Sequence, residues 1–313
     1  MKTLYNLDKL KNDYEAKGYL HIKEFFTKSE IEKYVETIDD ESFFVQDINL
    51  SPEISGNPVL SNIFNNENLI EIVKKLSNGN PTYFGMSSVV GHLKNNKNKT
   101  SWRRLHTDTR GNKQNVNGRT YYDPSKKRWP VFDIYIYLED FKNYSGCLKV
   151  VEGSHKKFLP SLGNFFKVFF NIKKLTKFDG KYSFKSIPFF HLFKNKNLKT
   201  SPGDIVIFNH AIHHSPNSLI IKKFPNISLP VIFENILEKF FPKIFLPNSA
   251  QRRIITICFG EESEELENFI RSRVQYLNKD FLKESKFFHD KDFIKKLSDN
   301  GVKSNLLLKN LLK

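Results

Sequence analysis

Cysteine, tryptophan and methionine are scarce in this sequence, with two residues of each among 313. The two cysteines, Cys147 and Cys258, exclude a disulfide-stapled scaffold. Both lie in apolar, strand-like stretches, so we expect reduced core residues. Runs of about 18 apolar residues are missing, which excludes a transmembrane helix of the usual length. The opening residues MKTLYNLDKLKND lack the apolar segment of a signal peptide, so we expect a cytoplasmic protein.

The periodicity of apolar residues places helices at both ends of the chain and strands in its middle. Helical spacing with capping residues predicts helices in three early segments and one late one, at 6–18, 27–38, 66–79 and 264–282. Alternating, β-branched or aromatic stretches predict strands at 19–26, 82–93, 131–140, 147–153, 203–214 and 252–260. We therefore predict a mainly β fold with flanking helices. Its core is a jelly-roll, or double-stranded β-helix, and no repeat or linker divides the single domain of residues 1–313.

The segment RRLHTDTRG, at residues 103–111, contains an imidazole and a carboxylate two positions apart. In an extended segment, residues i and i+2 point to the same side, so His106 and Asp108 can converge on one point. This is half of a metal site, which needs a third ligand from elsewhere. His-x-Asp also occurs by chance in many chains, so the motif alone is weak.

A longer motif follows at residues 132–156, FDIYIYLEDFKNYSGCLKVVEGSHK. Together with KGYLHIKEFFTKSEIEKY near the start and SPGDIVIFNHAIHHSPNS at 201–218, it resembles the phytanoyl-CoA hydroxylase family of iron(II)/2-oxoglutarate dioxygenases. The resemblance covers most of the chain. One departure is Glu152, where proline is usual in the family.

The resemblance supplies the third ligand. In family members the distal histidine lies eleven positions after the glycine of the Gly-Asp turn, which is Gly203 here, and this spacing selects His214. His213 is the alternative, because a bulge in the strand would reverse which side chain points inward. His106, Asp108 and His214 would then form the two-histidine, one-carboxylate triad that suits iron(II) and leaves three positions open.

The resemblance also implies residues for the co-substrate. An arginine that opens the last barrel strand binds the distal carboxylate of 2-oxoglutarate, and Arg252 in QRRIITICFG has that place, with Arg253 pointing the other way. Tyr135 matches a strand position that contacts 2-oxoglutarate, although an inward tyrosine can equally be core. Arg252 lies 38 positions after His214, farther than usual, so we predict a lid-like insertion at about 219–250. The long connection at about 156–200 is predicted to be a second lid-like insertion.

The chemistry implied is hydroxylation of a small organic substrate with iron(II), 2-oxoglutarate and dioxygen. Halogenating relatives lack the carboxylate ligand, so Asp108 favours hydroxylation or a related oxidation. The substrate class is either an amphiphile, such as a lipid or lipid-linked sugar, or a natural-product intermediate. The alternative is a non-catalytic basic protein that binds membranes or nucleic acid on the same scaffold. The oligomeric state is not indicated by any pattern.

Basic residues outnumber acidic ones by 50 to 34, and the excess is concentrated in one place. Residues 156–199 hold eleven lysines, ten phenylalanines and a single acidic residue, Asp179. Lys beside Phe, here and in FENILEKFFPKIFLP at 233–247, is typical of an element lying in the interface of an anionic membrane. Phenylalanine doublets suit an apolar phase better than base stacking, which argues against nucleic acid. The competing interpretation is that these phenylalanines simply cover the barrel while the lysines face water.

Overall fold

The computed structural model describes residues 5–40, 54, 57–90, 105–108, 129–156, 195–248, 253–276 and 291–304. Its helices are α1 (Leu7–Lys17), α2 (Lys28–Asp40), α3 (Glu67–Leu76), α5 (Val231–Phe240), α6 (Glu264–Tyr276) and α8 (Lys291–Asp299), with short 3-10 turns η3 (Leu60–Asn65), η5 (Ser154–Lys156) and η9 (Pro242–Ile244). Its strands are β1 (Tyr19–Ile22), β2 (Pro81–Val90), β3 (Val131–Tyr137), β4 (Cys147–Val151), β5 (Asn195–Leu198), β6 (Ile205–Asn209), β7 (His214–Ser218), β8 (Ile254–Glu261) and β9 (Lys303–Ser304).

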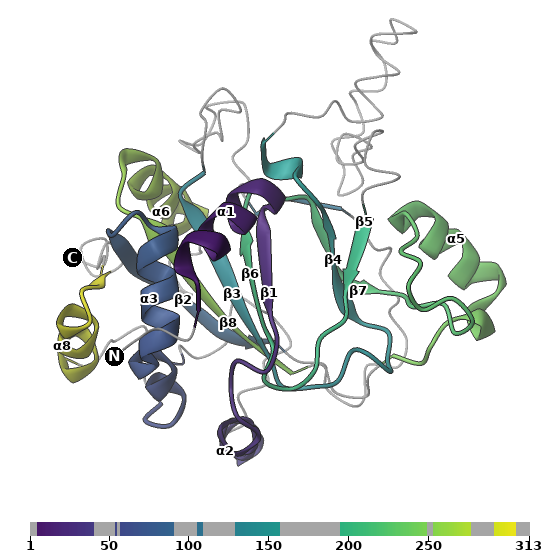
Figure 1. Cartoon of the computed structure of the whole chain (residues 1–313), viewed down its shortest axis with the longest axis horizontal. Helices are drawn as coiled ribbons and strands as arrows, with labels where there is room; N and C mark the ends of the chain where they lie inside the picture. The colour runs from purple at the N-terminus through teal and green to yellow at the C-terminus, as the bar shows by residue number, and fades with distance from the viewer. Residues whose placement is uncertain are drawn as a thin grey trace, which may run out of the picture.

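The strands form two sheets. The larger has the order β1-β6-β3-β8-β2-β9 and the smaller the order β5-β4-β7. Every pairing is antiparallel except that of β2 with β9. Figure 1 shows α3 and α8 on one side of the larger sheet, and the smaller sheet and α5 on the other. Two facing antiparallel sheets with flanking helices confirm the predicted jelly-roll class.

Each face of the larger sheet buries its own apolar set. Ile134 of β3 lies opposite Ile207 of β6 and Ile257 of β8, and this face packs on the helices α1 and α3. The opposite face carries Val206 and Phe208, which pack against the smaller sheet. Because side chains alternate along a strand, β3, β6 and β8 each supply both cores. The second face is the interior of the barrel.

The chain between residues 203 and 214 corrects one prediction. We expected a single strand through 203–214, but β6 ends at Asn209 and β7 begins at His214, with a turn between them. The Asn209 side chain stabilises this turn by accepting a hydrogen bond from the Ala211 amide at 2.8 Å. Because β6 belongs to the larger sheet and β7 to the smaller, the turn carries the chain from one to the other. An asparagine that accepts from the amide two residues later is a turn signal that the strand assignment overlooked.

The described residues include no helix that is long and apolar enough to span a membrane. Cys147 and Cys258 are buried and are not joined in a disulfide, as expected. The first Lys- and Phe-rich segment falls mostly on 157–194, outside the described residues. The second segment, 233–247, covers most of α5 and all of η9.

Candidate metal centre

The backbone fixes the His-x-Asp segment against the start of β7. His106 and His214 exchange two hydrogen bonds, each amide donating to the other residue's carbonyl at 2.9 Å. The Asp108 amide donates to the carbonyl of His210, also at 2.9 Å. Residues 105–108 therefore lie alongside the β6–β7 turn, far away in sequence.

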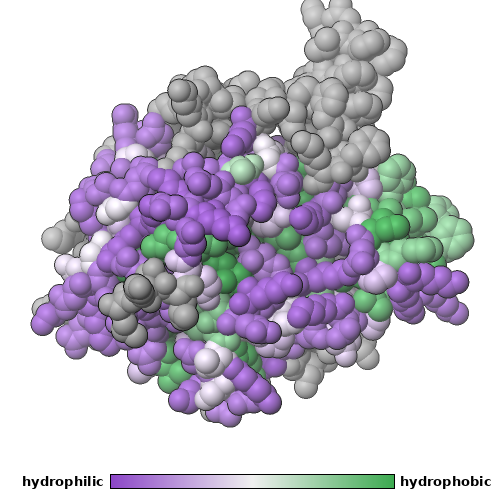
Figure 2. All heavy atoms as spheres, viewed as in Figure 1, coloured by the Kyte–Doolittle hydropathy of each residue, from purple (hydrophilic) through white to green (hydrophobic). Residues whose placement is uncertain are grey.

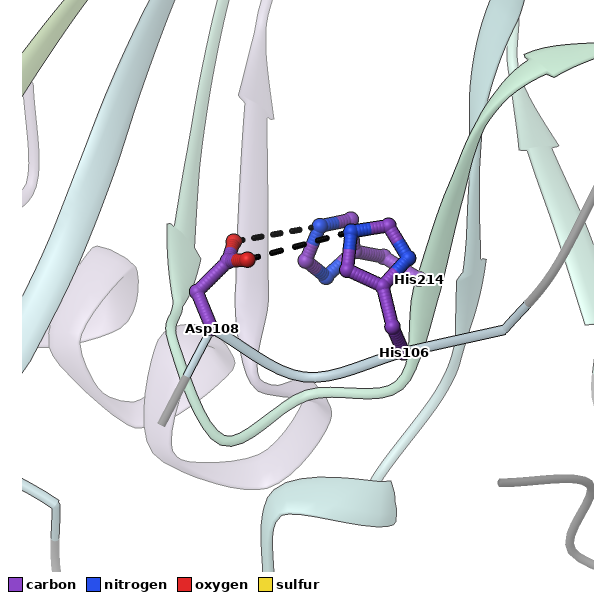
Figure 3. A group of neighbouring side chains, drawn as sticks. All are labelled: His106, Asp108 and His214. Atoms are coloured by element: carbon purple, nitrogen blue, oxygen red, sulfur yellow. Dashed lines mark ion pairs between the residues drawn. The ribbon is translucent and has the colours of Figure 1, made fainter. Parts of the chain in front are cut away.

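The side chains of His106, Asp108 and His214 converge on one point (Figure 3). Nε2 of His214 lies 3.2 Å from one carboxylate oxygen of Asp108, and Nε2 of His106 lies 3.8 Å from the other. One ligand atom from each of the three residues falls within 4.8 Å of the others. Divalent transition metals hold nitrogen and oxygen ligands at about 2.1 Å, so neighbouring ligands at right angles lie about 3 Å apart. The spacing and the donor set fit a metal ion.

Hydrogen bonding prepares His214 for such a role. Its Nδ1 lies 3.2 Å from the carbonyl of Ile212. A hydrogen bond there holds the ring and directs Nε2 toward Asp108, the arrangement usual for a metal-bound histidine. His214 is also almost fully buried.

The three side chains shift one another's pKa values. Burial alone would raise the pKa of the Asp108 carboxyl, but attraction to His214 and a hydrogen bond from it hold that pKa below its ordinary range. Burial lowers the pKa of His214, and the Asp108 carboxylate outweighs it, so this pKa is raised. A metal ion must therefore compete with a proton for the His214 nitrogen.

The sequence matches the family model for phytanoyl-CoA dioxygenase (PhyH) over residues 14–217, about two thirds of the chain. The chain belongs to the phytanoyl-CoA dioxygenase family. It is therefore an enzyme of the non-haem iron, 2-oxoglutarate-dependent class, as the resemblance implied. A comparison with curated proteins found no match.

Solved structures of similar fold include the non-heme alpha ketoglutarate dependent epimerase SnoN from nogalamycin biosynthesis. It is 13% identical, with 82% of this chain and 83% of that one covered and a TM-score of 0.50. HygX from Streptomyces hygroscopicus with iron bound is 16% identical, with 83% and 87% covered and a TM-score of 0.49. At these identities the likeness concerns the fold alone.

Two residues, Tyr135 and Arg252, were expected to bind 2-oxoglutarate, and the structure describes only the first of them. Tyr135 of this PhyH member is half-buried on β3, and its ring packs edge-on to Phe208 at 4.8 Å. Phe208 in turn lies 5.0 Å from the ring of His214, so Tyr135 is one aromatic layer from the triad. Arg252 lies outside the described residues. The Arg253 guanidinium, by contrast, donates to Glu139 at 2.6 Å.

The other two histidines of the β6–β7 turn, His210 and His213, are not part of this group of three. The backbone of His213 is fixed by its amide, which donates to Ser154, and by its carbonyl, which accepts from Val151. The ring of His210 meets Asp133 and Cys258 in a second cluster. Sequence reasoning missed this cluster, because its members come from three separate strands or strand ends and share no spacing pattern.

Proposed function

We propose that this PhyH enzyme hydroxylates a small organic substrate at an iron(II) held by His106, Asp108 and His214. The observation that carries the proposal is the convergence of two imidazole nitrogens and one carboxylate from segments far apart in sequence. This donor set suits iron(II) and leaves coordination positions open for 2-oxoglutarate and dioxygen. When bound, the iron supplies the oxidation of the substrate, and the protein supplies orientation and exclusion of water.

We assign the distal carboxylate of 2-oxoglutarate to Arg252. Ile254 of β8 packs in the barrel interior, and Arg252 precedes it by two positions in the sequence. Side chains two positions apart on a strand share a face. Arg253 has the opposite parity and already pairs with Glu139. Tyr135, beside Phe208, is the aromatic wall that we assign to the co-substrate.

The activity test measures succinate formation by the purified protein with iron(II), 2-oxoglutarate and air. Many such enzymes turn over slowly without their main substrate, so wild type should form succinate and Asp108→Ala should not. Asp13→Ala is a matched control, because Asp13 is an acidic residue of α1 that pairs with Lys17 at the surface. Iron-loaded wild type that forms no more succinate than Asp108→Ala would overturn the proposal.

We further propose that the substrate is an amphiphile or a natural-product intermediate. Similar folds include HygX with nickel, 2-oxoglutarate, and hygromycin B bound, and SnoK, a carbocyclase from nogalamycin biosynthesis. These names make a natural product one candidate class. A surface feature of this chain favours the other class, an amphiphile met at a membrane.

That feature is the α5 face, an exposed apolar area on α5, η9 and the loop before them. It consists of seven side chains that are each more than a third exposed: Phe224, Ile227, Phe233, Ile236, Phe240, Phe241 and Ile244. Figure 2 shows it as a continuous green area over α5 at the right. Four lysines belong to the same segment, Lys222, Lys223, Lys239 and Lys243. Apolar side chains flanked by ammonium groups match the acyl and phosphate layers of an anionic bilayer.

Sedimentation with vesicles tests this part separately. We expect the protein to bind anionic vesicles at low salt and to dissociate at high salt, because each lysine contributes on the order of 1 kcal/mol of screened attraction. The double substitution Phe240→Ser/Phe241→Ser should remove binding, whereas Val59→Ser, at an exposed apolar residue of another segment, should not. If wild type does not bind the vesicles at low salt, the membrane proposal is wrong and a soluble metabolite becomes the favoured substrate class.

A further inference from the structure

We propose that Asp133, His210 and Cys258 form a second metal site, one that takes a divalent cation with an affinity for sulfur, such as zinc. Nε2 of His210 lies 2.9 Å from a carboxylate oxygen of Asp133 and 3.9 Å from the sulfur of Cys258. The Cys258 sulfur also contacts the other carboxylate oxygen of Asp133. The three residues thus present one thiol, one imidazole and one carboxylate to a common point.

The scaffold of the cluster is rigid. Asp133 of β3 and Cys258 of β8 are cross-strand partners in the larger sheet. His210 follows the last residue of β6, and its amide donates to the carbonyl of Val131 at 3.1 Å. Paired strands hold ligands more precisely than loops do, as a metal site requires.

The distance between the Cys258 sulfur and the His210 nitrogen suits a tetrahedral cation. Zinc binds sulfur at about 2.3 Å and nitrogen or oxygen at about 2.0–2.1 Å, so a sulfur and a nitrogen on it lie about 3.6 Å apart. The observed separation between Cys258 and His210 is 3.9 Å. The Asp133 oxygen lies 2.9 Å from Nε2 of His210, closer than the roughly 3.3 Å between two such ligands on one tetrahedral ion, so the carboxylate would have to turn to admit the ion. Nδ1 of His210 has no hydrogen-bond partner among the described residues. The neutral imidazole can therefore carry its proton on Nδ1 and offer Nε2 to the metal ion.

The surroundings favour a cation over three isolated polar groups. Each of the three residues is more than nine-tenths buried. The apolar residues packed around Cys258 include Trp129, Val131, Leu266, Phe269 and Ile270, and the ring of Phe269 in α6 lies 5.5 Å from that of His210. A carboxylate in such a shell is costly unless its charge is compensated. A divalent ion bound by a thiolate and a carboxylate leaves no net charge.

The site is distinct from the triad but shares the β6–β7 turn with it. The carbonyl of His210 accepts the hydrogen bond from Asp108, while the His210 side chain turns to Asp133 and Cys258. A cation there would anchor the turn that positions His214. We assign it a structural part, because all three ligands are buried; a tetrahedral zinc ion there would take a fourth ligand, such as water, beside the three side chains.

The test is cobalt substitution, with the protein produced in cobalt-supplemented medium so that the buried site fills during folding. Wild type should contain two cobalt ions per chain and show a thiolate-to-cobalt charge-transfer band. Cys258→Ser should lose the band and one ion. Cys147→Ser is the matched control, because Cys147 is the other cysteine and is also buried; this variant should keep the band and both ions. A wild type without the band, or a band lost with Cys147 instead, would overturn the proposal.

Two further measurements keep the outcome interpretable. His106→Ala/His214→Ala should lose one ion and keep the band, which separates this site from the proposed iron site. Should Cys258→Ser fail to fold, zinc-edge X-ray absorption on zinc-loaded wild type decides. One sulfur neighbour at about 2.3 Å is expected, and a shell of only nitrogen and oxygen would refute the site.

Discussion

Removing the ammonium group of Lys149 should destabilise the protein strongly, because this lysine is fully buried. Lys149 of β4 and Glu234 of α5 form an ion pair of 2.6 Å, and neither side chain has any exposed surface. The ammonium group also donates to the carbonyl of Leu229. This pair fastens α5, and with it the α5 face, to the smaller sheet.

The magnitude follows from which charge is left behind. Lys149→Met keeps the length of the side chain but removes the charged partner of the buried Glu234 carboxylate and the donor to Leu229, at a cost of about 3–5 kcal/mol. For 313 residues, the unfolding entropy of about 2.1 cal/mol/K per residue converts this into a fall in Tm of about 4–8 °C. The double variant Lys149→Met/Glu234→Met leaves no buried charge and should recover most of the loss.

Circular dichroism during urea and thermal unfolding measures all three variants, with Glu234→Met completing the double-mutant cycle. The surface change Lys199→Met is the matched control, because the Lys199 ammonium group donates to Asn226 at an exposed position. A Lys149→Met loss below about 1 kcal/mol, or a double variant less stable than either single one, would refute the reasoning.

Three further predictions concern the co-substrate, a turn and pH. Arg252→Ala should raise the KM for 2-oxoglutarate steeply, since a buried carboxylate loses its charged partner, and a larger effect at Arg253 in steady-state kinetics would contradict the assignment. Gly203→Ala should cost a few kcal/mol in unfolding free energy, because φ is +89° and a Cβ would lie 2.4 Å from the carbonyl oxygen of Phe26; a neutral effect would be inconsistent with this turn. Burial lowers the pKa of His155 from 6.5 to about 4, so its neutral form contributes stability above pH 6.5 that is lost as pH falls toward 4. The difference in unfolding free energy between wild type and His155→Gln, measured in urea, should therefore shrink by at most about 3 kcal/mol between pH 6.5 and 4. A difference that stays constant over this range would contradict the lowered pKa.

The local elements of the fold were predictable from the sequence, because each depends on residues close together. The stripe of Leu69, Ile70 and Val73 placed α3, and alternation in VFDIYIY placed β3. The break between β6 and β7 was not predicted, because apolar residues continue through Ala211 and Ile212. That break depends on the pairing of two different sheets, which the local pattern does not contain.

The grouping of the three candidate ligands was predictable because a motif with fixed spacing exists. The structure brings His106, Asp108 and His214 together, and the spacing from Gly203 had selected His214 over His213. Lys149 shows what spacing cannot reveal. A charged residue in a five-residue strand is expected to be exposed. Lys149 is buried instead, because it pairs with Glu234 of α5, which lies 85 residues away in the sequence. Asp133, His210 and Cys258 escaped notice for the same reason.

Iron binding by His214→Ala and His213→Ala, measured side by side, tests the central claim most directly. The two residues are adjacent and chemically identical, so each variant controls for the other. Anaerobic titration with iron(II) should give binding for His213→Ala close to that of wild type, and no high-affinity binding at the triad for His214→Ala. Loss of binding with His213→Ala and its retention with His214→Ala would contradict the proposed iron site.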